Sequence, residues 1–381
     1  MSRVGTRIVG PARLAVATAL AALATLIGLM ASPDAARPVA TAATTPSGFY
    51  GVAPTTALTA GDFQRLAAAN IRTVRVIFYW PSISTGDGTF NWLNVDGAVI
   101  HASAAGVRLI PTLLGSPRHV SGDPLQPPLG SPQDESDWQD FVRSAVERYG
   151  PGGEFWDFVD NCPPDPGHCR PDVPYAPIRV WQAWNEPNLD RFWRPAPAVG
   201  EYARLLELTH EAIEETDPGA SLITGGISAG GGGGAGAIPQ NDFIAGLYQR
   251  NAAPHFDGLD VHPYRRKPKQ VGRAVQDARA VTRAYSDGDT PLWITEVGWS
   301  TSGPEGEALV TSRKKQGKYL RKTMRMLTAM REPLNIQLAS WFTYSDGQRI
   351  CEWCHGAGLF DTKGKAKPAW KKYVSVTGGQ P

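Results

Sequence analysis

Short hydrophobic runs alternate with longer amphipathic stretches along most of this chain of 381 residues. The runs are rich in β-branched and aromatic residues, which favour strands, and they cover residues 49–52, 71–80, 107–115, 178–186, 221–228, 257–264, 291–300 and 336–346. Stretches with helical periodicity lie between most of them, for example residues 138–149 and 310–330. Thr59, followed three residues later by Asp62, is a typical helix start. Strands separated by helices predict a parallel sheet.

The number of runs favours a closed sheet over an open one. Continuous apolar runs suit strands that are covered on both faces. Eight such strands with helical connections predict an α/β fold, a single (β/α)₈ TIM barrel over residues 48–381. A doubly wound sheet would need a glycine-rich phosphate turn after an early strand. The glycine-rich stretch at residues 228–237 instead follows the fifth run, and it resembles a low-complexity loop.

The N-terminus has the order of a targeting segment. Arg3, Arg7 and Arg13 precede an uncharged apolar run at residues 14–30, and small residues follow it. This order predicts a secretory signal peptide, with residues 1–47 as signal and flexible leader and a secreted mature protein. The alternative is an uncleaved membrane anchor, because about 17 apolar residues reach the lower limit for spanning a bilayer.

Charge adds little to this picture. The chain has 38 Lys and Arg against 36 Asp and Glu, a formal net charge of +2. Such a balance gives no reason to expect nucleic acid or an anionic membrane surface as a partner.

Two glutamates end different predicted strands. Glu186 closes the fourth run and Glu296 closes the seventh. In a (β/α)₈ barrel these strands stand roughly opposite each other, and their C-terminal ends form the rim that carries the active site. Hydrolysis of a glycosidic bond needs two carboxyl groups at one site. The alternative for either glutamate alone is a solvated residue at a strand end.

Several motifs resemble those of retaining glycoside hydrolases of clan A, most closely the family 5 and family 39 branches. They are WNEPN at residues 184–188, DVHPY at 260–264, ITEVGWS at 294–300 and SWFTYSDG at 340–347. The resemblance implies Glu186 as general acid/base, Glu296 as nucleophile, and Asn185 as the group that holds the sugar 2-hydroxyl. It implies no metal and no organic cofactor.

The resemblance also assigns supporting roles. Arg75 and Tyr264 would orient Glu296, His262 would line the site, and Trp341 would form the platform under the sugar. Each has a structural alternative: Arg75 could form an ion pair that fills the barrel, and His262 could be a core histidine.

Four cysteines, Cys162, Cys169, Cys351 and Cys354, fit an exported protein and allow three pairings. The first two precede the fourth strand and the last two follow the eighth, so they lie on opposite faces of the barrel. Pairs across the barrel are too long for disulfide geometry, which leaves the local pairs 162–169 and 351–354. CEWC also has the form of a redox motif, but no strand-to-helix context surrounds it.

These features predict a secreted retaining glycosidase that acts on a polysaccharide or oligosaccharide. We expect a monomer with no nucleic acid partner and no stable membrane partner. A carbohydrate-binding barrel without catalysis is one alternative, which the presence of both glutamates disfavours. A thiol oxidoreductase built on CEWC is the other.

Overall fold

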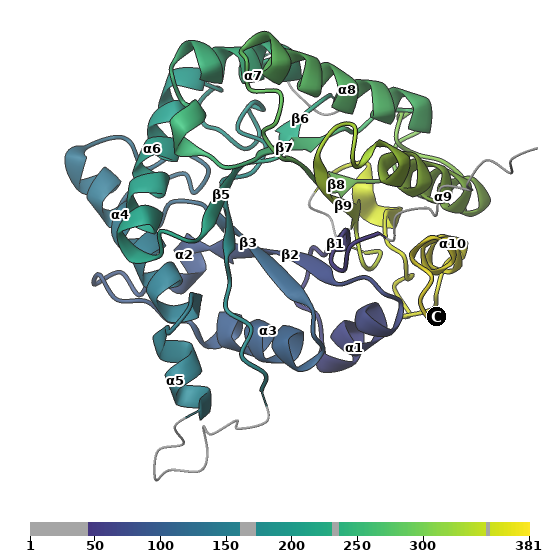
Figure 1. Cartoon of the computed structure of the whole chain (residues 1–381), viewed down its shortest axis with the longest axis horizontal. Helices are drawn as coiled ribbons and strands as arrows, with labels where there is room; N and C mark the ends of the chain where they lie inside the picture. Colours follow the sequence, from purple (N-terminus) through teal and green to yellow (C-terminus); the bar gives the residue numbers. More distant parts are fainter. Residues whose placement is uncertain (1–44, 161–172, 231–235, 348–350) are drawn as a thin grey trace, which may run out of the picture. The chain divides into compact units, whose positions relative to one another are not determined.

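A ring of parallel strands lies inside a ring of helices (Figure 1). The computed structural model describes residues 45–160, 173–230, 236–347 and 351–381, and residues 45–381 form one compact unit. Within the described residues, the strands are β1 Tyr50–Ala53, β2 Thr73–Tyr79, β3 Arg108–Leu114, β4 Val180–Ala183, β5 Ser221–Thr224, β6 Ile227–Ser228, β7 Leu259–His262, β8 Leu292–Val297 and β9 Ile336–Phe342.

The order of the strands closes the ring. Neighbours follow the order β5-β4-β3-β2-β1-β9-β8-β7-β6, and the paired strands are parallel. Ile223 of β5 forms a parallel bridge with Gly258, directly before β7, and the Thr224 amide donates to the Gly258 carbonyl at 3.0 Å. The prediction of a (β/α)₈ barrel is therefore confirmed, and all eight predicted strands are present.

The fifth predicted strand is split into β5 and β6 by Gly225 and Gly226. A Cβ atom on Gly226 would lie 1.9 Å from Nε2 of His262. A side chain at this position is therefore incompatible with the imidazole, and the glycine leaves room for a histidine that projects into the barrel mouth.

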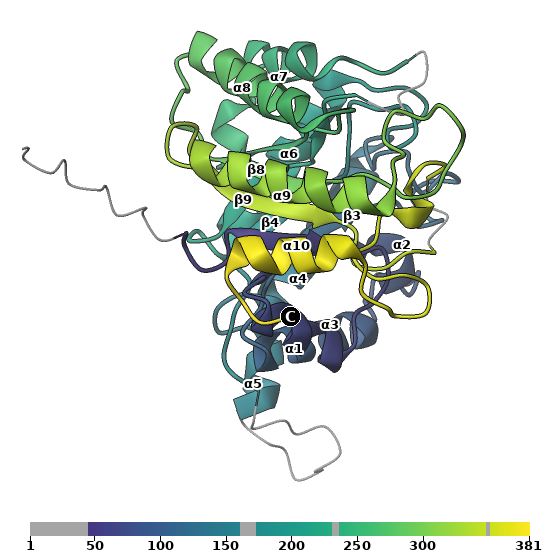
Figure 2. The ribbon, with the colours of Figure 1, turned by 90° about the vertical axis from the view of Figure 1, so that its right-hand side faces the viewer.

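The helices surround the strands. They are α1 Ala60–Ala68, α2 Trp80–Ile83, α3 Leu93–Ala104, α4 Pro132–Tyr149, α5 Glu154–Asp160, α6 Val199–Thr216, α7 Gln240–Gln249, α8 Pro268–Ala284, α9 Arg313–Met330 and α10 Pro368–Thr377, with short 3₁₀ turns η1 Ala253–His255 and η2 Cys354–Gly356. The predicted start of α1 is confirmed, because the Thr59 side chain accepts from the Asp62 amide and closes a capping box. Figure 2 shows α9 and α10 next to each other on the outside of the barrel.

The barrel interior combines an apolar and a polar part. Ile110, Ile223, Trp293 and Leu338 form a buried cluster that comes from strands alone. Arg75 faces Ile110 across the β2–β3 pair, so both side chains point inward. Polar interior side chains are costly to bury unless they are paired, and their partners define the site described below.

The cysteine predictions have different outcomes. Cys162 and Cys169 lie outside the described residues, so their pairing stays a prediction. Cys351 and Cys354 form a disulfide, with Cα atoms 5.5 Å apart, which confirms the predicted local pair. Within the described ranges, none of the helices is both long and apolar enough to span a bilayer.

Candidate active site

An irregularity in β8 aims Glu296 into the barrel. The register of β8 against β9 advances by three residues from Ile294 to Val297 while β9 advances by two. One residue is therefore extra on β8, and such a bulge re-aims side chains. As a result, adjacent residues both reach the interior: Thr295 bonds to Asp260 and Glu296 bonds to Arg75.

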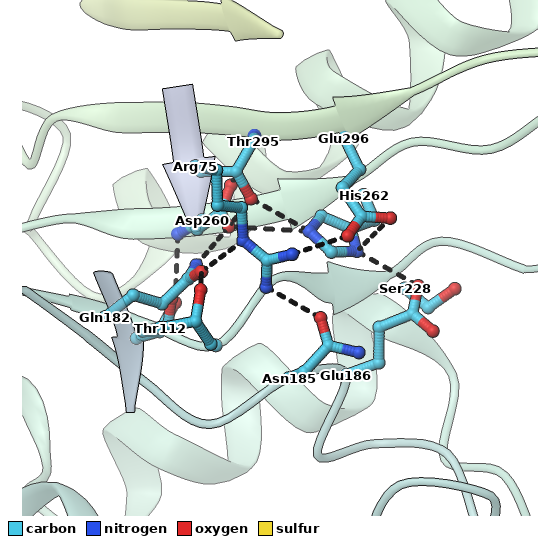
Figure 3. Close-up of polar contacts among 12 residues, drawn as sticks. Arg75, Thr112, Gln182, Asn185, Glu186, Ser228, Asp260, His262, Thr295 and Glu296 are labelled. Carbon is cyan, nitrogen blue, oxygen red and sulfur yellow. Dashed lines mark hydrogen bonds and ion pairs between the residues drawn. The ribbon is translucent and has the colours of Figure 1, made fainter. Parts of the chain in front are cut away.

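The end of β4 is also irregular. Beyond Ala183, Trp184 has φ 68° and Glu186 has φ 42°, both in the left-handed region that non-glycine residues rarely adopt. Trp184 is fully buried, and its Nε1 donates to the Phe192 carbonyl at 2.6 Å. Such backbone strain costs on the order of 1–3 kcal/mol per residue and is concentrated at functional sites. After this turn the Asn185 side chain points toward Arg75 and the Glu186 side chain toward His262 (Figure 3).

Arg75 of β2 links the two irregular strand ends. Its Nη1 donates to Glu296 Oε1 at 2.5 Å, its Nη2 to Asn185 Oδ1 at 2.7 Å, and its Nε to Gln182 Oε1 at 2.6 Å. The Arg75 side chain is only 3% exposed, so its ion pair with Glu296 is screened little by water. The same ion pair therefore fills the barrel interior and positions Glu296, so the two predicted roles of Arg75 do not exclude each other.

Tyr264 and His262 complete the contacts of the two carboxylates. The Tyr264 hydroxyl donates to Glu296 Oε2 at 2.6 Å, and His262 Nδ1 lies 3.0 Å from Glu186 Oε1. Burial raises the pKa of Tyr264 well above its usual value, and the charge of Glu296 adds to the effect, so the hydroxyl stays protonated. Burial lowers the pKa of His262, but the nearby carboxylates, Glu296 first, outweigh burial and raise it overall.

Asp260 anchors a polar chain beneath these groups. This fully buried carboxylate accepts from the Thr295 amide at 3.0 Å, from the Thr295 hydroxyl at 2.5 Å and from Gln182 Nε2 at 2.5 Å. Because the Thr295 hydroxyl donates to Asp260, its oxygen accepts from His262 Nε2 at 2.9 Å. The hydrogen on Nε2 fixes the orientation of the imidazole and leaves Nδ1 to share a proton with Glu186.

We predict that Asp260→Ala lowers the free energy of unfolding by about 3 kcal/mol, because it leaves several buried donors without an acceptor. Urea denaturation followed by circular dichroism measures the change. Asp242→Ala, a change of an exposed aspartate in α7, is the matched control and should leave the midpoint nearly unchanged. Equal midpoints for the two variants would contradict the anchoring role of Asp260.

A cavity of about 260 Å³ opens above the two glutamates. It is lined by Pro54, Thr55, Arg75, Ile77, Leu114, Asn185, Glu186, Arg191, Phe192, Tyr264, Glu296, Phe342, Cys351 and Trp353. The structure therefore brings Arg75, Asn185, Glu186, Tyr264 and Glu296 to one cavity. His262 lies directly behind it, buried and bonded to Glu186.

Trp341 is the one predicted site residue that the structure places elsewhere. It is fully buried, its Nε1 donates to the Ala357 carbonyl at 3.1 Å, and it does not line the cavity. Side chains alternate along a strand, and Leu338 of β9 points into the barrel, so Phe342 points inward and Trp341 outward. The buried position of Trp341 argues against its predicted role as the sugar platform, and its neighbour Phe342 lines the cavity.

Three further residues belong to the site or its support and were not predicted: Gln182, Asp260 and Trp353. The alternation of Asp260 with His262 is a usable signal, because two polar residues two positions apart share one face of a strand. Gln182 carries no comparable signal, since an amide within a strand is common. Trp353 lies beyond the last strand, where sequence periodicity gives no orientation.

Glu186, His262 and Glu296 could also be regarded as metal ligands. One ligand atom from each lies within 4.8 Å of the others. However, the Arg75 guanidinium already pairs with Glu296, and its positive charge would repel a divalent cation bound there. The same spacing is what paired catalytic carboxyl groups require, and the donor set favours that use.

Comparisons with known proteins agree with this geometry. The family model described as glycosyl hydrolase catalytic core matches residues 177–373. A β-xylosidase of Geobacillus stearothermophilus is 27% identical over 195 residues, which are 45% of this chain and 32% of that enzyme. The chain thus matches only about a third of that relative's length.

Solved structures share the fold. A family 39 glycoside hydrolase from Bacteroides cellulosilyticus WH2 has a TM-score of 0.63 at 17% identity, over 86% of this chain and 63% of that one. The GH39 enzyme from Xanthomonas axonopodis pv. citri has a TM-score of 0.62 at 19% identity, over 89% and 68%. The fold defines a (β/α)₈ barrel with a pair of glutamates at its C-terminal rim. This chain belongs to the glycosyl hydrolase catalytic core family, which confirms the predicted resemblance.

Proposed function

We propose that the protein is a retaining glycosidase that hydrolyses O-glycosidic bonds, expected to be β-linked, of a polysaccharide or oligosaccharide. The observation that carries the proposal is the spacing of the glutamates: one oxygen of Glu186 lies within 4.8 Å of one oxygen of Glu296. Retaining enzymes place their carboxyl groups about 5–5.5 Å apart, and inverting enzymes about 6.5–9.5 Å apart to admit a water. The observed spacing supports direct attack by a carboxylate.

Glu296 is the proposed nucleophile. Each of its oxygens accepts one hydrogen bond, from Arg75 and from Tyr264. The positive charge of Arg75 pairs with the carboxylate, and the two bonds fix the direction of the carboxylate. Attack on the anomeric carbon would form a glycosyl ester on Glu296, as the sugar–oxygen bond breaks.

Glu186 is the proposed general acid and base. The hydrogen-bond chain from Asp260 through Thr295 leaves His262 Nδ1 facing Glu186 Oε1, with one proton between them. A protonated Glu186 can donate its proton to the leaving oxygen. Its contact with His262 Nδ1 keeps the carboxyl group in place during this step. After departure of the leaving group, the Glu186 carboxylate can take a proton from water, which then hydrolyses the ester. Asn185, held by Arg75, is the proposed contact for the sugar 2-hydroxyl.

The stereochemical outcome tests this proposal. We expect the first-formed sugar to have the same anomeric configuration as the substrate, because two displacements restore it. Proton NMR of an aryl β-glycoside reaction during the first minutes, before mutarotation, reads the configuration. Inversion would contradict the retaining mechanism. A panel of aryl glycosides without turnover would favour the carbohydrate-binding alternative.

Export remains part of the proposal. It rests on the basic, apolar and small-residue order of residues 1–47, and a cleaved chain would begin between about residues 31 and 43. Intact-mass measurement of the protein from a culture medium tests it, and a mass that includes residues 14–30 would favour the anchor. The predicted monomer and the predicted lack of a stable membrane partner stay predictions.

A further inference from the structure

The CEWC motif at residues 351–354 lies at the wall of the candidate active site. Cys351 and Trp353 line the same cavity as Glu186 and Glu296. The Cys351–Cys354 disulfide closes a short ring, and Trp353 is a member of that ring. Neither a redox enzyme nor a remote structural staple explains why the ring faces the cavity.

The Trp353 ring packs on Tyr264, which holds the proposed nucleophile, and on Phe342. Its centroid lies 5.2 Å from that of Tyr264 with the planes at 69°, and 6.0 Å from that of Phe342 at 50°. Both Tyr264 and Phe342 line the cavity, and the Tyr264 hydroxyl bonds to Glu296. Trp353 is thus one side chain away from Glu296, and it lines the same cavity.

The segment that follows Trp353 is tied to the barrel. The Gly356 carbonyl accepts from Lys367 Nζ at 2.7 Å, from Gln316 Nε2 at 3.1 Å and from the Thr301 amide at 2.8 Å. Lys367 is almost fully buried and also bonds to Asp346 at 2.9 Å. Cys354, itself 3% exposed, begins the short turn η2 that ends at this fixed glycine. The disulfide therefore connects Cys351 to an anchored point.

We propose that Trp353 is the aromatic platform for the substrate sugar, and that the Cys351–Cys354 disulfide is the clamp that holds the platform in place. The proposal rests on the glycosidase function above. The apolar C–H face of a pyranose matches an indole ring, as in other ligand sites lined by aromatic side chains. Trp353 then takes the role that Trp341, buried behind the strand, does not have.

The clamp makes sugar binding sensitive to reduction. A dithiol reductant supplies two electrons and two protons, so the disulfide becomes two thiols and the reductant becomes a disulfide. Cys351 lines the cavity, which gives the reductant a path. Once the ring is open, Trp353 gains conformational freedom that binding must remove again. Arg75, Glu186 and Glu296 lie outside this ring, on or next to β2, β4 and β8, and stay in place.

The first experiment compares Trp353→Ala with Trp353→Phe on 4-nitrophenyl β-D-xyloside, with D-xylose as competing ligand. We expect the alanine variant to raise KM and the inhibition constant of D-xylose about tenfold or more, a size typical of truncating a tryptophan at a binding surface. Its kcat should stay within about threefold, because ground-state and transition-state binding fall together. The phenylalanine variant should recover part of the loss. Unchanged KM and inhibition constants in the alanine variant would overturn the platform.

The second experiment tests the clamp in a background with Cys162→Ser and Cys169→Ser, so that one cysteine pair remains. Dithiothreitol should raise KM several-fold in this background, and adding Cys351→Ser with Cys354→Ser should give the same rise without reductant. The reductant should then have no further effect. A serine pair with the KM of its background would overturn the clamp.

A failure of the proposed platform can be distinguished from a failure of the proposed glycosidase function. A wild-type protein that hydrolyses no aryl glycoside would contradict the proposed glycosidase. Calorimetric titration of D-xylose would still test the platform in that case, since the Trp353→Ala variant must bind it more weakly than the wild type. Equal binding would reject the platform independently of catalysis.

Discussion

Replacing Glu296 with alanine is expected to lower kcat by at least about 10⁴-fold on every glycoside, as for other enzymes that lose their nucleophile. The reason is geometric: Glu296 is held by Arg75 and Tyr264 within 4.8 Å of Glu186, and no other carboxylate lines the cavity among the described residues. Single-turnover and steady-state kinetics with an aryl β-glycoside measure the loss. Glu305→Gln, a change of an exposed glutamate, should keep wild-type activity.

Two further measurements keep this prediction specific. Glu296→Gln preserves the shape of the side chain and an oxygen for Arg75, so its loss of activity cannot be ascribed to a lost hydrogen bond or to an empty space. Azide added to Glu296→Ala should enter the vacated space and displace the leaving group once, which gives a glycosyl azide of inverted configuration. Retained configuration, or residual activity above about 10% of wild type, would contradict Glu296 as nucleophile.

The chain's pattern predicts the barrel and most of the site because both depend on the same regularity. Hydrophobic runs define the strands, and the residue that ends each run lies at the C-terminal rim. Glu186, Glu296, Tyr264 and Asn185 are therefore brought together by topology, although up to 111 residues separate them in sequence. The inward direction of Arg75 follows from its position within the second strand.

The failures arise where regularity ends. The extra residue in β8 changes which side chains face inward, and nothing in ITEVGWS indicates that Thr295 and Glu296 both do so. In β9, Trp341 and Phe342 are neighbours, and only the register of the strand decides which of them points inward. The structure turns Phe342 to the cavity and Trp341 away from it.

The polar interior shows a different limit. Apolar strands predict an apolar barrel filling, but Gln182 and Asp260 lie in the interior and are fully buried. Each is acceptable only because the other supplies a hydrogen bond, together with Arg75 and Thr295. Such mutual satisfaction depends on distances across the barrel, which a single strand's sequence does not encode.

Replacing Glu186 with alanine should have an effect that depends on the leaving group. Natural glycans need a proton on the departing oxygen, and their turnover should fall by about 10²–10⁴-fold, the usual worth of a general acid. Dinitrophenolate leaves without a proton, so the rate of the glycosylation step of dinitrophenyl glycosides should stay close to that of the wild type. The glycosyl-enzyme should then accumulate. A burst of dinitrophenol and an intact mass raised by one sugar would show it. For these substrates, the loss of Glu186 as general base slows only the hydrolysis of the glycosyl-enzyme.

Azide provides the decisive comparison for Glu186. A small anion needs no general base, so it should attack the accumulated ester in the Glu186→Ala variant and restore turnover of the dinitrophenyl glycoside. Because this is the second displacement, the glycosyl azide should have retained configuration, opposite to that from Glu296→Ala. His262 loses its partner at Nδ1 in the same variant, so Glu186→Gln, which keeps an oxygen there, controls for movement of the imidazole and should behave like the alanine variant towards activated substrates. If both variants instead lose activated and natural substrates equally, or azide gives inversion, the two glutamates exchange roles and Glu186 is the nucleophile.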